Sequence, residues 1–432
     1  MFGPRSSGQL IEKIGVSQPT MSRALGRMAK EIVRIGSGSL IQYALRDMAR
    51  GMEDVPVYRV TEAGRLQCLG SLIAVDPGPT AMVFRSSDGK ASFFEDLPWW
   101  ADDMRPQGFL GRAFAARHGQ ARGLPDDPRM WSGTQTLRAL VIHGHDGVGN
   151  LLFGERNRTH FLTMPNPVPL SFREFPRLAA GASAGDDPGS SAGGEQPKFL
   201  AYAETSEGPK HTIVKFAGSG NEVQRRWRDL LATEHLALET LRAHGETASM
   251  SWLADEADQR FLVSERFDRV GATGRRALVS LSTLNCEFVA NSARTWPEIA
   301  RCLFDEGLVV EASLPRIETL WAFGALIGNT DMHLGNLAFF SGEGPPYQVA
   351  PAYDLLPMIF APSRDGVLRF EMRPVRLDSS LAPESLRRAH AMAIDYVGRL
   401  RHEKRISKAF FPCIDALEQQ LQIVDKMLAR LA

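Results

Sequence analysis

The nine residues from Gly328 to Asn336, GNTDMHLGN, are the most informative segment of this 432-residue chain. They place an Asp, a His and two Asn directly after the apolar run LWAFGALI (Leu320–Ile327). Asn and Asp commonly end a helix because their side chains bond to nearby backbone groups, but one or two suffice for that purpose. Four such polar side chains in so short a stretch indicate a functional loop.

The spacing inside this loop predicts a phosphoryl-transfer site. Asp331 precedes Asn336 by five positions, as the catalytic Asp precedes the metal-binding Asn in the kinase loop H-R-D-x-x-x-x-N. A second carboxylate, Asp354, follows in AYDLL. Phosphoryl transfer needs Mg²⁺ held by hard oxygen ligands and a base beside the attacking hydroxyl. We therefore predict that Asp331 is the base and that Asn336 and Asp354 bind Mg²⁺. His333 is expected to orient the loop or to stabilise charge there.

A predicted β-hairpin upstream supplies a candidate phosphate-binding lysine. Pro197–Glu204 and His211–Ala217 alternate apolar and polar residues on either side of a glycine turn. Lys215 lies in the second strand between apolar neighbours, so it needs a partner. The helix predicted over Gln224–Arg242 offers Glu234 as an ATP-site partner of Lys215. Two other acidic residues of the same segment remain alternatives, Glu222 and Glu239.

Two further segments fit the upper half of an ATP site. Gly181–Gly194 (GASAGDDPGSSAGG) has no large apolar side chain, and we expect Gly193 and Gly194 to lie against the nucleotide phosphates. A plain flexible linker is the alternative for this stretch. Phe261–Arg269 (FLVSERFDR) follows as a strand and a charged turn, where Glu265 and Phe267 are expected to contact ATP as a hinge.

The amino-terminal segment has the pattern of a winged helix-turn-helix domain. Helices are predicted over Ser7–Ile14 and Ser17–Met28, and a two-stranded wing over Ile32–Ile35 and Leu40–Leu45. Residues 1–50 contain eight basic and three acidic residues, 8 − 3 = +5, in a chain of balanced charge. This local field favours phosphate, so DNA is a predicted partner.

The second of these helices is the expected recognition helix. Its start offers Gln18, Thr20, Met21 and Arg23 as exposed positions, and Arg27 adds a positive charge further along. The predicted DNA contacts are Gln18, Thr20, Arg23 and Arg27. A small helical domain with solvated arginines is the plainer alternative.

The stretch between this domain and the hairpin predicts a small α+β unit. Short apolar stretches from Val57 to about Gly119 indicate strands. His143 and His145 in VIHGHDG are a possible metal pair by residue type, but no third ligand is evident, so we expect a strand end followed by a glycine turn.

These motifs together resemble the HipA family of bacterial serine/threonine kinase toxins. The resemblance rests on SAGGEQPK (191–198), Lys215, ERFDR, NTDMHLGN and AYDLL in that order, and it covers roughly residues 57–425. The added helix-turn-helix resembles the YjjJ-like branch, in which DNA binding is fused to the kinase. The resemblance implies ATP and Mg²⁺ as cofactors and autophosphorylation of a loop serine, which alignment places at Ser191 with Ser190 as the alternative. It also implies a protein substrate, and the family's targets include aminoacyl-tRNA synthetases.

Composition excludes several other classes of protein. The chain is 44% hydrophobic and 23% charged, as expected of a globular protein. No run of 18 apolar residues and no apolar leader occur, so secretion and membrane spanning are disfavoured and a cytoplasmic location is expected. The four cysteines lie far apart, which predicts reduced thiols and argues against zinc.

The expected architecture is α+β, a two-lobed protein-kinase-like fold of the HipA type preceded by a small winged helix-turn-helix domain. We assign residues 1–55 to DNA binding, 56–180 to an α+β subdomain, 181–270 to a kinase N-lobe with glycine-rich loop and hinge, and 271–432 to a helical C-lobe with the catalytic loop. Winged-helix proteins often read two half-sites as dimers, which is the basis for expecting a homodimer. The alternative function is a DNA-binding transcriptional regulator whose pseudokinase body senses a nucleotide. A small-molecule kinase is a weaker third reading.

Overall fold

The computed structural model describes residues 3–119, 124–183, 196–289, 293–342, 344–375 and 380–429. Their contacts form two compact units, which we describe separately. Unit 1 comprises Met1–Gln107, Phe114–Pro165 and Thr273–Arg275, and unit 2 comprises Gly108–Ala113, Asn166–Ala272 and Arg276–Ala432. The boundaries of the four domains expected from the sequence remain predictions.

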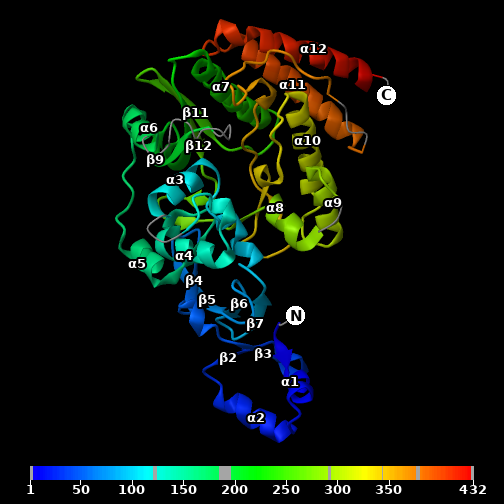
Figure 1. Ribbon diagram of the computed structural model, residues 1–432. Helices are drawn as coiled ribbons and strands as arrows, with labels where there is room; N and C mark the ends of the chain where they lie inside the picture. Colours follow the sequence, from blue (N-terminus) through cyan, green and yellow to red (C-terminus); the bar gives the residue numbers. More distant parts are fainter. Residues whose placement is uncertain are drawn as a thin grey trace. The chain divides into compact units, whose positions relative to one another are not determined.

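Unit 1 begins with the predicted helix-turn-helix and wing (Figure 1). Its elements are β1 (Arg5–Ser6), α1 (Ser7–Ile14), α2 (Gln18–Arg27), β2 (Ile32–Ile35) and β3 (Gln42–Leu45). The strands form a three-stranded sheet in the order β1-β3-β2. Ser6 starts α1 with a reciprocal capping box to Gln9, and Gly15 ends it with a left-handed φ of 74°.

One expectation for this region is wrong. Met21 is buried, with 5% of its surface exposed, so its side chain is not available to DNA. The basic set is also partly used inside the fold, since Arg46 pairs with Asp54 at 2.6 Å and Arg50 pairs with Asp47 at 2.9 Å. Asp47 is already included in the net charge of +5, whereas Asp54 lies outside residues 1–50, so only the Arg46 pair reduces the charge available to phosphate.

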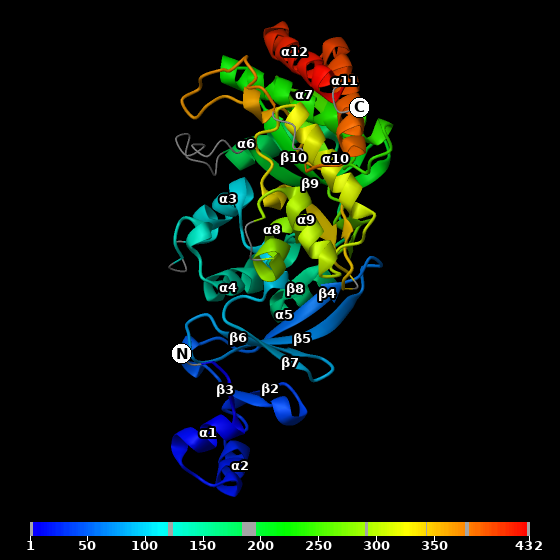
Figure 2. The same cartoon turned by 90° about the vertical axis from the view of Figure 1, so that its right-hand side faces the viewer.

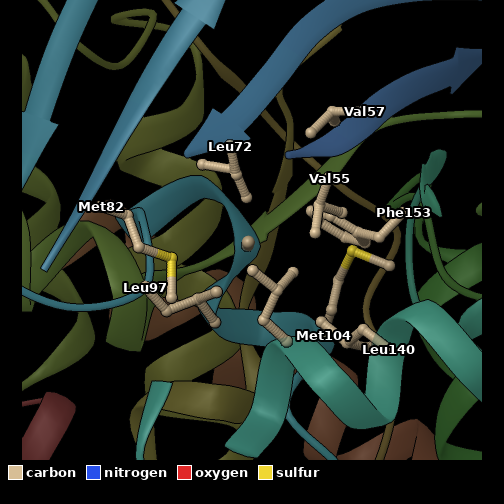
Figure 3. Packing of buried hydrophobic residues seen from close by; sticks show 10 residues of the cluster. Val55, Val57, Leu72, Met82, Leu97, Met104, Leu140 and Phe153 are labelled. Atoms are coloured by element: carbon tan, nitrogen blue, oxygen red, sulfur yellow. The ribbon is translucent and has the colours of Figure 1, made fainter. Parts of the chain in front are cut away.

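The rest of unit 1 is built on a five-stranded sheet in the order β7-β6-β5-β4-β8. The strands are β4 (Val55–Val60), β5 (Leu66–Ala74), β6 (Met82–Ser86), β7 (Ala91–Phe94) and β8 (Leu151–Phe153). Helices α4 (Gly133–His143) and α5 (Gly154–Thr163) contact strands of the sheet. Helix α3 (Gly108–His118) belongs to unit 1 only from Phe114 onward. Figure 3 shows the core, in which Val55, Leu72 and Phe153 pack with Met104 and Leu140.

The prediction of a strand end at VIHGHDG is wrong. His143 is the last residue of α4, and Gly144–Asp146 form a 3-10 turn. Ser132 caps this helix with a capping box to Gln135, and its apolar residues recur at helical spacing. Short apolar runs do not distinguish a strand from a buried helix, which explains the error.

The wing shares a hydrophobic core with the larger sheet of unit 1. Val33, Ile35 and Ala44 of the wing strands pack with Ile73 and Val83 of β5 and β6. The wing is thus anchored by apolar burial, which is the main stabilising contribution available to so small an element.

Unit 2 contains a four-stranded antiparallel sheet in the order β11-β12-β10-β9. Its strands are β9 (Lys198–Thr205), β10 (Gly208–Ala217), β11 (Ser251–Glu256) and β12 (Gln259–Glu265). The predicted hairpin is therefore present as β9 and β10. Helix α7 (Glu222–Ala243) packs on the sheet, and Asn221 caps it by accepting a 2.8 Å hydrogen bond from the Gln224 amide.

The remainder of unit 2 is mainly helical, as expected. Its helices are α6 (Phe175–Ser183), α8 (Leu281–Leu284), α9 (Trp296–Asp305), α10 (Ser313–Leu326), α11 (Pro383–His402) and α12 (Phe411–Leu428). Short strands β15 (Leu278–Ser280), β16 (Ala338–Phe340) and β17 (Gln348–Val349) form a three-stranded sheet. Figure 1 and Figure 2 show α7, α10, α11 and α12 grouped together. Among the described residues, no helix is both long and apolar enough to cross a membrane.

Candidate active site

Lys215 lies at the centre of a buried charge cluster in unit 2. Its Nζ donates to both carboxylate oxygens of Glu234, at 2.7 and 2.8 Å, and to Oδ1 of Asp354 at 2.5 Å. Lys215 comes from the inner strand β10, Glu234 from α7, and Asp354 from the segment after β17. Three residues separated widely in the sequence, and all predicted to serve an ATP site, are thus brought together.

The two alternatives to Glu234 do not make this contact. Glu222 is the first residue of α7, and Glu239 approaches His235 at 3.7 Å. Glu234 is the candidate that reaches Lys215 because it lies on the face of α7 that packs on β10.

Burial and the attraction between opposite charges together set the pKa values of this cluster. Only 10% of the Lys215 side chain and 2% of the Glu234 side chain are exposed. Burial raises the pKa of Glu234 to about 7, although Lys215 counteracts part of that rise. Burial would also raise the pKa of Asp354, but the charges of Lys215 and Lys198 outweigh it and lower the value to about 2. The pKa of Lys215 is raised because its two carboxylate partners overcome the opposing effect of burial.

The loop that follows α10 joins Asp331 to the other predicted residues. Asn329 accepts a hydrogen bond from the Asp331 amide at 3.0 Å and donates to the Asp354 carbonyl at 3.3 Å. Asn336 donates from Nδ2 to the Asp331 carbonyl at 2.8 Å. The Asp331 side chain is exposed, so a substrate hydroxyl can approach it.

His333 supports the shape of this loop. Its Nδ1 accepts from the Gly335 amide at 3.0 Å, capping the 3-10 turn Leu334–Asn336. Its carbonyl accepts from Trp296 Nε1 at 3.2 Å. Two roles were expected for His333, orienting the loop and stabilising charge. These contacts are of the kind that orients the loop.

Asn336 and Asp354 have the chemistry needed to bind Mg²⁺. Donation from Nδ2 fixes the Asn336 amide and leaves its oxygen as an acceptor, and Asp354 contributes a carboxylate. Hard oxygen ligands of this kind, completed by nucleotide phosphates, suit Mg²⁺. Asp354 adopts a left-handed φ of 53°, a conformation that Asp tolerates better than most residues and that recurs at functional sites.

His, Cys, Asp and Glu are the side chains that commonly bind metals in proteins. Within the part of the chain that the structure describes, no group of three or more His, Cys, Asp or Glu side chains could hold a metal ion.

The sequence reasoning missed two residues near the cluster. Lys198 lies directly opposite Lys215 in the β9–β10 register, and opposed residues of a ladder project from the same face. Tyr353 donates to the Gly335 carbonyl at 2.7 Å, which links the residue before Asp354 to the loop of Asp331. For Lys198, the sequence signal was its position opposite Lys215 in the predicted hairpin. For Tyr353, it was the position next to Asp354.

The predicted hinge residues Glu265 and Phe267 differ in their surroundings. The Glu265 amide donates to the Met250 carbonyl at 2.8 Å, and its carbonyl accepts from Ser249 Oγ at 2.9 Å. No partner for the Phe267 amide is found among the described residues. The Phe267 ring lies 5.6 Å from the Tyr353 ring, between centroids. Glu265 and Phe267 both remain predicted nucleotide contacts.

Ser190, Ser191, Gly193 and Gly194 lie outside the described residues. The chain re-enters at Gln196, whose Nε2 donates to the Phe216 carbonyl next to Lys215. Gln196, the first residue described after Ser183, therefore lies beside the strand that carries the lysine.

The candidate DNA-binding residues lie on α2 of unit 1. Gln18, Thr20, Arg23 and Arg27 are all exposed on α2. Arg23 Nε donates to the Pro19 carbonyl at 3.3 Å, and Thr20 shares a 3.0 Å hydrogen bond with Ser17.

Two family models and one relative together match nearly the whole chain. The model described as the YjjJ-like toxin, middle domain, matches residues 51–162, and the HipA-like C-terminal domain matches residues 190–426. The chain is 37% identical over 435 residues to Toxin YjjJ of Escherichia coli (strain K12), covering 99% of this chain and 97% of that protein.

A solved structure supports the fold. A chain from the Shewanella oneidensis MR-1 toxin–antitoxin complex of HipA, HipB and its operator DNA superposes with a TM-score of 0.51 at 14% identity. The match covers 85% of this chain and 95% of that chain. With the mixed helices and sheets described above, this similarity confirms the expected α+β, HipA-like fold.

Proposed function

Because this chain belongs to the HipA-like toxin family, in its YjjJ-like group, we propose that it is an ATP- and Mg²⁺-dependent protein serine/threonine kinase. The observation that carries the proposal is the joining of Lys215 to Glu234 and Asp354, close to a loop that holds Asp331 and Asn336. A scaffold without activity has no need of this complete set.

Each residue has a defined part in the proposed transfer. Lys215, kept protonated by its carboxylate partners, holds the α- and β-phosphates. Asn336 and Asp354 bind Mg²⁺, which neutralises phosphate charge when bound. Asp331 accepts the proton of the substrate hydroxyl. That hydroxyl oxygen bonds to the γ-phosphorus, the bond from γ-phosphorus to the β–γ bridging oxygen breaks, and ADP leaves.

The substrates are proposed from the family alone. A host protein is the external target, with an aminoacyl-tRNA synthetase as the candidate class, which would place the enzyme in the cytoplasm. Ser191, or Ser190, is the internal target. A phosphoserine there carries a charge near −2, which would repel ATP phosphates from the loop that must hold them.

We also propose that the α2 surface binds DNA and that the protein regulates its own operator as a homodimer. The exposed side chains of Gln18, Thr20, Arg23 and Arg27 support this part. In the related Shewanella complex, HipA is found with HipB and operator DNA. A regulator with an inactive, nucleotide-sensing body is the competing function.

Transfer of label from γ-labelled ATP separates the two functions. Asp331→Asn should retain the fold and ATP binding but lose transfer, and chelation of Mg²⁺ should abolish transfer by the parent. Equal rates for the parent and the variant would remove Asp331 from the role of base. Nucleotide binding without transfer, on protein free of prior phosphate, would favour the regulator.

A further inference from the structure

A buried arginine on α7 has no role in the proposed transfer. Arg226 is only 3% exposed and lies eight residues before Glu234 on the same helix. At 1.5 Å per residue, the two positions are roughly 12 Å apart along the helix axis. A buried guanidinium needs compensating contacts, so its partners indicate what it does.

Arg226 holds both arms of the segment that follows Asp354. Its Nη1 donates to the Phe360 carbonyl at 2.9 Å and to the Arg369 carbonyl at 2.8 Å. Its guanidinium carbon lies 4.7 Å from the Phe370 ring centroid and 5.3 Å from the Phe410 ring centroid. Such cation–π contacts add to the hydrogen bonds when the cation is desolvated.

The same segment, residues 358–372, also touches the start of the Asp331 loop. The Ile359 amide donates to the Gly328 carbonyl at 3.0 Å. A Cβ added at Gly328 would lie 2.8 Å from Ile359 Cγ2 and 3.4 Å from Met372 Cε. Gly328 has a φ of +77°, so the close approach and the backbone conformation both depend on glycine.

The turn of the segment packs against the first turn of α7. Gly366 donates to the Ser363 carbonyl at 2.9 Å, and a Cβ added at Gly366 would lie 3.4 Å from Val223 Cγ2. Residues 358–372 therefore contact α7 at Val223 and Arg226 and the Asp331 loop at Gly328.

We propose that Arg226 is a positioning residue that couples residues 358–372 to α7, so that docking of this segment aligns Glu234 with Lys215 and fixes the start of the Asp331 loop. The inference rests on the proposed kinase function. If residues 358–372 did not dock on Arg226, α7 would be free to shift. Lys215 would then lose its alignment toward the ATP phosphates. ATP use would then fall without any change in the residues that touch ATP.

The test compares three variants by amide hydrogen exchange without nucleotide and by steady-state kinetics. Arg226→Met keeps the apolar stem and removes the charge, and Arg226→Lys keeps a donor that can reach two carbonyls. Arg260→Met is the control for a different buried contact of α7, because Arg260 is also buried and donates to the carbonyl of Arg228 on that helix, as well as to the Arg405 carbonyl and to Asp255.

We expect Arg226→Met to speed exchange of the Ile359 and Gly366 amides at least tenfold, to raise the KM for ATP and to lower kcat. Arg226→Lys should restore much of the parental exchange rate, KM and kcat. Arg260→Met should leave the KM for ATP and the exchange rates of these two amides near the parental values. Unchanged exchange in Arg226→Met, or the same changes in Arg260→Met, would overturn the coupling. A lower kcat at constant KM would show a smaller folded fraction and would equally overturn it. If neither the parent nor any variant transfers phosphate, the kinase proposal fails. The hydrogen-exchange result would still decide whether Arg226 docks residues 358–372.

Discussion

The charge of Glu234 makes the candidate site sensitive to pH near neutrality. Burial raises the pKa of Glu234 to about 7, so the carboxylate that holds Lys215 is protonated below that pH. Asp354 stays ionised, since its pKa is lowered to about 2. We expect kcat/KM for ATP to fall several-fold between about pH 8 and about pH 6. Glu234→Gln, which cannot ionise, should be less active and should lose this dependence; a full dependence in the variant would assign it to another group.

The stability contribution of the same group has the opposite sign. The folded state binds the Glu234 proton more tightly than the unfolded chain does, so this contribution is present at low pH. It is lost as the pH rises from the ordinary carboxyl range through about 7. Thermal unfolding of the parent and of Glu234→Gln across that range should show the parent losing stability relative to the variant as pH rises.

Asn329 is the residue that ties the proposed base to the proposed metal ligand. It bonds to the Asp331 amide and to the Asp354 carbonyl, so its loss should loosen both. We expect Asn329→Ala to lower kcat by about 10²-fold, as small misplacements of catalytic groups do. The neighbouring Thr330 is exposed, and Thr330→Ala is the control with near-parental activity. Equal rates for the two variants would show that Asn329 does not position the loop.

At the level of a single helix, Gly324 of α10 makes room for the Asp331 loop. A Cβ at this position would collide with Met332, whose Cε would be 2.6 Å away. Gly324→Ala gains about 1 kcal/mol of helix propensity, but it must displace Met332, the residue next to Asp331. We expect kcat to fall roughly tenfold with little loss of thermal stability, since a flexible side chain can move.

Gly398 of α11 offers the matched control for that prediction. Nothing lies within 4 Å of a Cβ built there, so Gly398→Ala should gain the same propensity of about 1 kcal/mol and leave the rate unchanged. A Gly324→Ala variant as active as Gly398→Ala would show that Met332 does not hold the loop.

Helix α2 carries the prediction for DNA. Arg23→Ala should weaken binding at every sequence tested and reduce the salt slope by about 1 if Arg23 contacts phosphate. Arg46→Ala removes the same charge from a residue that is paired with Asp54, so it should change the slope little. Titrations at several salt concentrations measure both; equal slopes for parent and Arg23→Ala would remove Arg23 from the interface.

Helices and strands were predictable from the sequence where caps, turns or a clear alternation of apolar residues specify them locally. Helix α1 begins and ends at the predicted residues because Ser6 and Gly15 supply caps. The β9–β10 hairpin follows from alternation around a glycine turn. The helical end at His143 was not predictable because a short apolar run has no decisive period, and the burial of Met21 depends on tertiary contacts that the sequence of α2 alone does not specify.

Across the whole molecule, the candidate site was predictable only where residue type and order carried it. Asp331, Asn336 and Asp354 stand out as polar residues at a kinase-like spacing, and Lys215 as a charge in an apolar strand. Lys198, Tyr353 and Arg226 did not stand out, because their roles depend on register and on contacts between distant segments. Long-range packing of this kind has no local sequence signature.

The central claim is that the cluster around Lys215 transfers phosphate from ATP. The most direct measurement is the intact mass of purified protein, first shown to carry no phosphate, before and after incubation with ATP and Mg²⁺. The account predicts a gain of phosphate on Ser191 or Ser190 in the parent and none in Asp331→Asn. No gain in the parent, or an equal gain in the variant, would contradict it.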